Sequence, residues 1–197
     1  MKQTRLQQMQ IKIEEGYGKE IADEIGLEFE RLCQSQSDIL PSFSSHAYKN
    51  IFPVVATYRT LLKFGYSSDL AESISSQTFL QLMEVPKKKL QNMMRVPGLY
   101  RCMPWLWKKL VPKMFGKDAG FDFRFYPTKN DQVKFDMVKC PYYEMCKLLD
   151  CENLAWIFCK TDDICYGNMH FKLKWLRTQT IANGDSVCDF HLKIDKK

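Results

Sequence analysis

The stretch FDFRFYPTKNDQVKFDMVKC, residues 121–140, marks the change from helical to strand-like patterning along the chain. Apolar and polar residues alternate strictly in FDFRFY and along most of VKFDMVKC, as they do in half-buried β-strands. The polar sequence PTKND lies between the two runs and is typical of a turn. Residues 121–140 therefore predict an antiparallel hairpin.

Upstream of this hairpin, apolar residues recur at helical spacing. A second helix is predicted over residues 51–62, with Gly65 just beyond its end. A third helix begins after Ser67, whose hydroxyl is suited to cap it, and should end before Pro86. The first helix is predicted by four apolar residues that lie three or four positions apart: Ile21, Ile25, Phe29 and Leu32.

Downstream of the hairpin, two helices and a second hairpin are expected. Pro141 is well placed as the first residue of the helix PYYEMCKLL, and ENLAWIFCKTDDICYG predicts another helix. The segments FKLKWLRTQT and SVCDFHLKI predict two more strands. The expected fold class is α+β, with a helical region (residues 1–118) and a β-β-α-α-β-β region (residues 119–197) whose antiparallel sheet is covered by helices. We expect the two regions to form one compact unit.

Composition narrows the classes of function. The net charge of +6 is spread over scattered lysines without a stacking motif, so no nucleic-acid partner is expected. No apolar run approaches the length of a membrane span, and a cytoplasmic location is expected. The eight cysteines include no C-x-x-C pair, so neither disulfides nor a metal site are expected. Residues 103–117 combine two tryptophans with four lysines and could form a basic amphipathic segment on a membrane surface. We favour the alternative, a solvated helix that is interrupted by Pro112 and whose tryptophans pack inward.

The last hairpin has a predicted register. Asn183-Gly184 is typical of a two-residue type I′ turn, which would set Ala182 opposite Asp185. The apolar face then pairs Leu173 with Ile194, Trp175 with Leu192, Arg177 with Phe190 and Gln179 with Cys188. The other face pairs Leu176 with His191 and Thr178 with Asp189.

Arg177 would thus project from an apolar face beside Cys188, where a guanidinium requires an anionic partner. That partner is either Asp162 or Asp163 of the preceding helix or the carboxylate of a substrate. Cys188 is either a buried strand thiol or a thiolate that the nearby arginine stabilises.

Several short motifs in the C-terminal half are ordered and spaced as in one known family. On these motifs, residues 139–191 resemble the L-2-amino-thiazoline-4-carboxylic acid hydrolase family, and residues 58–74 (YRTLLKFGYSSDLAESI) are similar to its N-terminal helical portion. The resemblance implies hydrolytic opening of a cyclic isothiourea to an N-carbamoyl cysteine. The motifs are Cys140-Pro141-Tyr142, Cys159 followed by Asp162, Arg177-Thr178-Gln179-Thr180, and Gly184-Asp185 followed by Cys188-Asp189-Phe190.

Such a reaction needs a thiolate nucleophile or a water molecule activated by a base. The thiolate route would use Cys188 or Cys140, with His170 or His191 carrying the proton; the water route would use Asp162 or Asp189. The expected partner is a small substrate with a carboxylate, and no cofactor is expected. The substrate-binding candidates are Arg177, Gln179, Thr178 and Cys159.

A sensor domain without catalysis is the alternative function. The motif Gly-Asp-x-x-Cys-x-Phe, residues 184–190, is similar to one in vinyl-reductase-type domains that bind small apolar ligands. Arg177 distinguishes the two functions, because an apolar ligand does not require a cation.

Overall fold

The computed structural model describes residues 3–36 and 38–196, which form two compact units. The first unit comprises Met1–Leu82 with Glu144–Phe158, and the second comprises Met83–Tyr143 with Cys159–Lys197. The expected class is confirmed: the chain is α+β, with a helical N-terminal half and a four-stranded antiparallel sheet in its C-terminal part.

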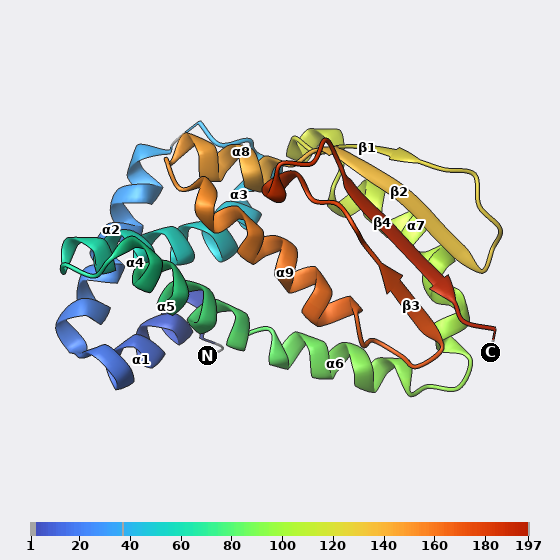
Figure 1. Ribbon diagram of the computed structural model, residues 1–197, viewed down its shortest axis with the longest axis horizontal. Coiled ribbons are helices and arrows are strands. Elements are labelled where there is room, and N and C mark those ends of the chain that lie inside the picture. The colour runs from blue at the N-terminus through green and yellow to red at the C-terminus, as the bar shows by residue number, and fades with distance from the viewer. Residues whose placement is uncertain (1–2, 37, 197) are drawn as a thin grey trace. The chain divides into compact units, whose positions relative to one another are not determined.

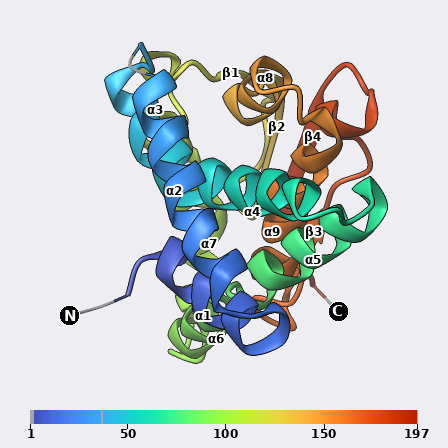
Figure 2. The ribbon, with the colours of Figure 1, turned by 90° about the vertical axis from the view of Figure 1, so that its left-hand side faces the viewer.

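The first unit is helical and has α4 at its centre. In this helix nine of the twelve residues are buried, and α2 packs across it (Figure 2). The predicted ends are confirmed, since Gly65 has a φ of 85° after α4 and the Ser67 hydroxyl caps α5. The helices are α1 (Arg5–Tyr17), α2 (Lys19–Ser35), α3 (Pro41–His46), the π-helical turn η1 (Ala47–Ile51), α4 (Phe52–Lys63) and α5 (Ser68–Gln81).

Two later helices start or end in this first unit. α8 (Pro141–Leu148) begins at Pro141 as predicted, and η4 (Glu152–Leu154) leads into α9 (Ala155–Tyr166). Glu72 of α5 accepts hydrogen bonds from Asn153 Nδ2 and Trp156 Nε1, both at 2.8 Å. The rest of α9, from Cys159 onward, belongs to the second unit and carries part of the site.

The second unit is built on the sheet, whose strand order is β1-β2-β4-β3 (Figure 1). The strands are β1 (Asp122–Phe125), β2 (Gln132–Lys139), β3 (Leu173–Leu176) and β4 (Cys188–Ile194). Its helices are α6 (Glu84–Met94), α7 (Met103–Met114) and the short 3₁₀ turns η2 (Leu99–Cys102), η3 (Lys117–Ala119) and η5 (Ile181–Asn183). No helix among the described residues is long and apolar enough to cross a membrane.

One face of the sheet is apolar and is covered by α7, which lies behind β2 and β4 in Figure 1. Phe135 of β2 stacks on Phe190 of β4 with ring centroids 4.9 Å apart, and Trp107 of α7 packs edge-on against Trp175 of β3. Cys188 pairs with Met137 and belongs to this face, whereas Asp189 pairs with Asp136 on the other. α7 continues through Pro112, so the expected interruption is wrong; Pro112 lies on the exposed side of the helix.

The register of the last hairpin is confirmed as far as Leu176, which pairs with His191, but the predicted turn is wrong. β3 ends at Leu176, and residues 181–183 form a 3₁₀ turn in which only the following Gly184 has a positive φ, of 90°. Asp185 N donates to Thr180 O, so Ala182 does not face Asp185. The ladder ends because the Asp189 carboxylate accepts hydrogen bonds from the amides of Thr178 and Gln179 in competition with strand pairing.

Candidate active site

Arg177 is the centre of a polar cluster inside the second unit. Its side chain is only 4% exposed, and its guanidinium donates to three oxygens of α9. Nη1 lies 3.2 Å from Asp162 Oδ2, and Nη2 lies 2.8 Å from Asp163 Oδ1 and 2.7 Å from Cys159 O. The partner of Arg177 in this structure is therefore the pair of helix carboxylates, the first of the two alternatives that the sequence left open.

Aromatic rings enclose the guanidinium. Arg177 Cζ lies 5.7 Å from the centroid of the Trp175 ring and 5.6 Å from that of Phe190. Trp175 Nε1 also donates to Asp163 Oδ1 at 3.1 Å, so the indole holds the same carboxylate as the arginine. Because the side chain of Arg177 is only 4% exposed, little water reaches its guanidinium, and the electrostatic interactions that it makes are stronger than at a surface.

Cys188 is a buried thiol whose surroundings favour the thiolate. The side chain of Cys159 hydrogen-bonds its sulfur, the amide of Ile181 donates to it at 3.2 Å, and the charge of Arg177 acts in the same direction. Together these groups lower the pKa of Cys188 despite its burial. The pKa of Cys159 is raised instead, first by its hydrogen bond to Cys188 and then by burial. Cys159 is therefore the protonated member of the pair, and the thiolate is favoured on Cys188.

Cys140 belongs to the same cluster but has the opposite character. It directly precedes α8 and interacts electrostatically with Cys188 and Asp162. Burial raises the pKa of Cys140 to about 12, although the amides of Tyr143 and Tyr142 hydrogen-bond its sulfur. A protonated thiol at this position can donate a hydrogen bond but is a poor nucleophile.

Asp162 is the titratable group of the cluster. Burial raises its pKa to about 7, and the charge of Asp163 adds to the shift while Arg177 opposes it. Its side chain is nevertheless 34% exposed, and that of Asp163 is 38% exposed. Asp162 can therefore exchange a proton with solvent or with a bound molecule near neutral pH.

Asp189, Thr178 and Gln179 lie outside this cluster. The Asp189 carboxylate accepts hydrogen bonds from Thr178 N and Oγ1, both at 2.8 Å, and from Gln179 N at 2.6 Å. Asp189 projects from the sheet face opposite Cys188. The side chain of Gln179 is exposed, whereas that of Cys188 is buried. The three residues hold the loop that follows β3, and this geometry favours a positioning role for them.

The two histidines considered as proton carriers also lie elsewhere. His191 is on the same face as Asp189, where its Nε2 lies 2.9 Å from Gln132 Oε1. His170 precedes β3, and its ring stacks on Tyr100 at 4.5 Å. The acidic side chain that interacts electrostatically with Cys188 is that of Asp162.

Sequence reasoning missed two groups of this site and identified a third only in part. Asp163 was considered only as one of two partners, yet both carboxylates bind Arg177. The amide of Ile181 was not considered, because its contact with Cys188 depends on the 3₁₀ turn. Thr180 Oγ1 is buried without a hydrogen-bond partner among residues 3–36 and 38–196, and no pattern in the sequence indicated this.

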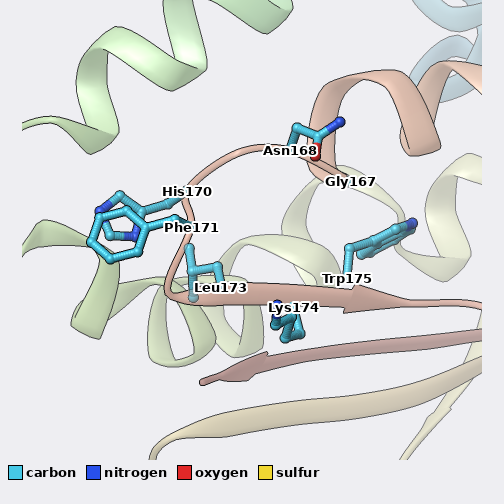
Figure 3. Close-up of a pocket in the computed structure, with 7 residues that line it drawn as sticks. All are labelled: Gly167, Asn168, His170, Phe171, Leu173, Lys174 and Trp175. Atoms are coloured by element: carbon cyan, nitrogen blue, oxygen red, sulfur yellow. The ribbon is translucent and has the colours of Figure 1, made fainter. Parts of the chain in front are cut away.

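A separate shallow pocket of about 340 Å³ lies where α9 leads into β3 (Figure 3). It is lined by Gly167, Asn168, His170, Phe171, Leu173, Lys174 and Trp175. Of these, only Trp175 also contacts Arg177, and the pocket has no cysteine or carboxylate. The cluster around Arg177 therefore remains the better candidate for chemistry.

Metal-binding geometry and similarity to known proteins bear on what this cluster can do. Within the described residues, no group of three or more His, Cys, Asp or Glu side chains has the arrangement of a metal site. No curated protein is significantly similar to the chain. The family model of L-2-amino-thiazoline-4-carboxylic acid hydrolase matches residues 45–192, which include every member of the Arg177 cluster. The chain belongs to the L-2-amino-thiazoline-4-carboxylic acid hydrolase family.

Proposed function

We propose that this protein is a hydrolase that opens a small cyclic amidine or isothiourea, such as 2-amino-thiazoline-4-carboxylate, to an N-carbamoyl amino acid. The observation that carries the proposal is the set of three groups around Cys188: a thiol that donates to it, an arginine that lowers its pKa, and a carboxylic acid whose pKa is about 7. These groups supply a nucleophile and a proton carrier for one electrophilic carbon.

The exposed side of the cluster fits a cationic ring. The side chains of Asp162 and Asp163 are about one-third exposed, whereas that of Arg177 is enclosed and paired with both of them. A protonated amidine is planar and cationic, so it can donate to the carboxylate of Asp163 and to the carbonyl oxygen of protonated Asp162. We assign Arg177 to holding the carboxylates and stabilising the thiolate, because its guanidinium is already engaged.

In the proposed first half-reaction, Cys188 Sγ forms a bond to the ring carbon between nitrogen and sulfur. The bond from that carbon to the ring sulfur then breaks, and protonated Asp162 donates its proton to the departing sulfur. This step leaves an isothiouronium group on Cys188 and a carboxylate on Asp162. The raised pKa of Asp162 suits it to this exchange, because the acid is still populated at neutral pH.

In the second half-reaction, water attacks the same carbon while Asp162 takes one of its protons. The bond to Cys188 breaks, and its electron pair returns to sulfur as the thiolate. The urea leaves protonated and releases its last proton to solvent. Cys159 and Ile181 N stabilise the returning thiolate by the hydrogen bonds that lower its pKa.

Product analysis after incubation with 2-amino-thiazoline-4-carboxylate tests the proposal. The expected product is the substrate plus one water, with a new free thiol. Cys188→Ser should abolish turnover, whereas Cys102→Ser, at an exposed position in η2, should leave it unchanged. Full activity of folded Cys188→Ser would show that the nucleophile is not the Cys188 thiolate but a water molecule that Asp162 activates. Absence of turnover on any cyclic amidine or isothiourea would refute the proposed function.

A further inference from the structure

Apolar side chains are exposed along one continuous segment of the second unit, from α6 through η2 to α7. The two largest exposed rings associated with it are Trp105 on α7, 57% exposed, and Phe171 in the loop before β3, 78% exposed. Met93 and Val96, at the end of α6 and just beyond it, are also exposed. Scattered single apolar residues are ordinary on a surface, but several within one structural segment need an explanation.

The loop before β3 is attached to this segment by direct contacts. Gln91 Nε2 of α6 donates to Asn168 O at 2.9 Å, and the ring of Tyr100 in η2 stacks on His170. Figure 3 shows the side chains of His170 and Phe171 projecting together from the loop, away from Trp175. The loop therefore packs on α6 and η2, and η2 in turn contacts α7. The exposed side chains of residues 84–117 and 167–172 are together named the basic apolar surface.

The charge of this surface is strongly one-sided. Between Glu84 and Lys117 the sequence has nine lysines and arginines and only one acidic residue. The whole chain has a net charge of +6, so acidic residues outnumber basic residues over the rest of it. Within the loop, Lys172 Nζ lies 5.7 Å from the Phe171 ring and 5.9 Å from the Tyr100 ring.

α7 has two faces of different character. Trp107 and Val111 point inward, and Trp107 packs against the sheet. On the outward side, Trp105 is accompanied by the exposed Lys109 and Lys113 at steps of four residues. The sequence expectation that both tryptophans pack inward is therefore correct for Trp107 and wrong for Trp105.

We propose that the basic apolar surface binds the surface of a bilayer that contains anionic phospholipid. Exposed tryptophan and phenylalanine insert at the boundary between headgroups and acyl chains, and lysines that flank them reach anionic headgroups. An anionic bilayer is the partner that complements this surface. Its headgroups attract the excess of cations, and its acyl-chain boundary takes the apolar side chains out of water. The protein lies on the bilayer through this surface, and the proposal is independent of the hydrolase activity.

Flotation of the full-length protein with vesicles tests the proposal. Vesicles of phosphatidylcholine alone should bind little protein, and vesicles that also contain phosphatidylglycerol should bind it at low salt. Raising the salt concentration to about 1 M should release the protein, because the Debye length then falls to about 3 Å. Equal binding to both compositions, or no binding to either, would overturn the proposal.

Two double variants locate the contact. Lys109→Glu with Lys113→Glu should weaken partitioning by at least about tenfold, because two cations near the anionic surface become anions. Trp105→Ser with Phe171→Ser should also weaken it by at least about tenfold, because two large apolar side chains no longer insert at the acyl-chain boundary. The matched controls are Leu27→Ser and Lys19→Glu, at exposed positions of α2 in the other unit, which should bind as the wild type does. Equal losses in the controls would overturn the assignment to this surface.

Two further measurements test the proposal without relying on variants that could fail to fold: fluorescence quenching by lipid and self-association without lipid. The tryptophan fluorescence of the wild type should be quenched by brominated phospholipid only in anionic vesicles, and Trp105→Phe should remove most of that quenching while retaining binding. Self-association without lipid that Trp105→Ser abolishes would identify the surface as an interface between copies of the chain and refute the proposal.

Discussion

Replacement of Arg177 by lysine should destabilise the protein far more than conservation of charge would suggest. The guanidinium makes three hydrogen bonds, at 2.7, 2.8 and 3.2 Å, to oxygens of α9. The lysine ammonium is a single nitrogen and lacks the planar fork of donors that the guanidinium has. It therefore cannot reach all three acceptor oxygens at once. At least one carboxylate and the carbonyl of Cys159 would then lose their donor.

The magnitude follows from these contacts. Hydrogen bonds to charged groups contribute about 1.5–3 kcal/mol each, and a buried acceptor without a donor costs about 1–3 kcal/mol. Asp162 and Asp163 are about one-third exposed, so water can replace part of what they lose. We therefore expect Arg177→Lys to lower the free energy of unfolding by about 2–4 kcal/mol.

Urea unfolding followed by circular dichroism measures this loss. Because the chain forms two compact units, the transition should also be followed by tryptophan fluorescence to test whether it is two-state. Arg31→Lys is the matched control: Arg31 bridges Glu24 and Glu28 on the exposed surface of α2, where solvent screens ion pairs and they contribute little to stability. Equal effects of the two substitutions would refute the conclusion that Arg177 organises a buried cluster.

Three further predictions concern the same region. Between pH 3.8 and about 7, folded Asp162 retains a proton that the unfolded chain releases, so the free energy of unfolding should fall as pH rises through this range. Asp162→Asn should remove this decline and the inflection near pH 7 in kcat/KM; an unchanged pH profile would exclude Asp162 as the proton carrier. Asp189→Ala should cost about 1–2 kcal/mol in urea unfolding through its loop hydrogen bonds, and a larger effect on kcat than on stability would contradict a positioning role. Gly184→Ala should lower the free energy of unfolding, measured by thermal unfolding, by about 1 kcal/mol, because alanine is strained at a φ of 90°. No neighbour lies within 4 Å of a new Cβ, so this strain is the whole effect; a stabilised variant would contradict this conformation.

The sheet and its helices were predictable because each depends on local periodicity. The alternation of Leu173 and Trp175 against Leu192 and Ile194 was sufficient to fix the register of β3 with β4. The loop after Leu176 was not predictable, because the Asp189 side chain captures backbone amides that would otherwise continue the ladder. A tertiary contact here overrides the strong local preference of Asn183-Gly184 for a tight turn.

The site was predictable only in part for the same reason. Placing Arg177 and Cys188 on the apolar face led to the expectation that Asp162 lies near them, and the structure brings these three residues together. The carbonyl of Cys159 and the amide of Ile181 are backbone groups, which every residue has, so no residue pattern indicates their role. Likewise, only the structure distinguishes the outward Trp105 from the inward Trp107.

Mass spectrometry of the Cys188 peptide after rapid acid quench tests the central claim most directly. During turnover of 2-amino-thiazoline-4-carboxylate, Cys188 should carry the ring-opened substrate, and the adduct should disappear as substrate is exhausted. Because the pKa of Cys140 is about 12, that thiol should carry no adduct and serves as the internal control. Steady turnover without any adduct on Cys188, or with the adduct on another cysteine, would contradict the account.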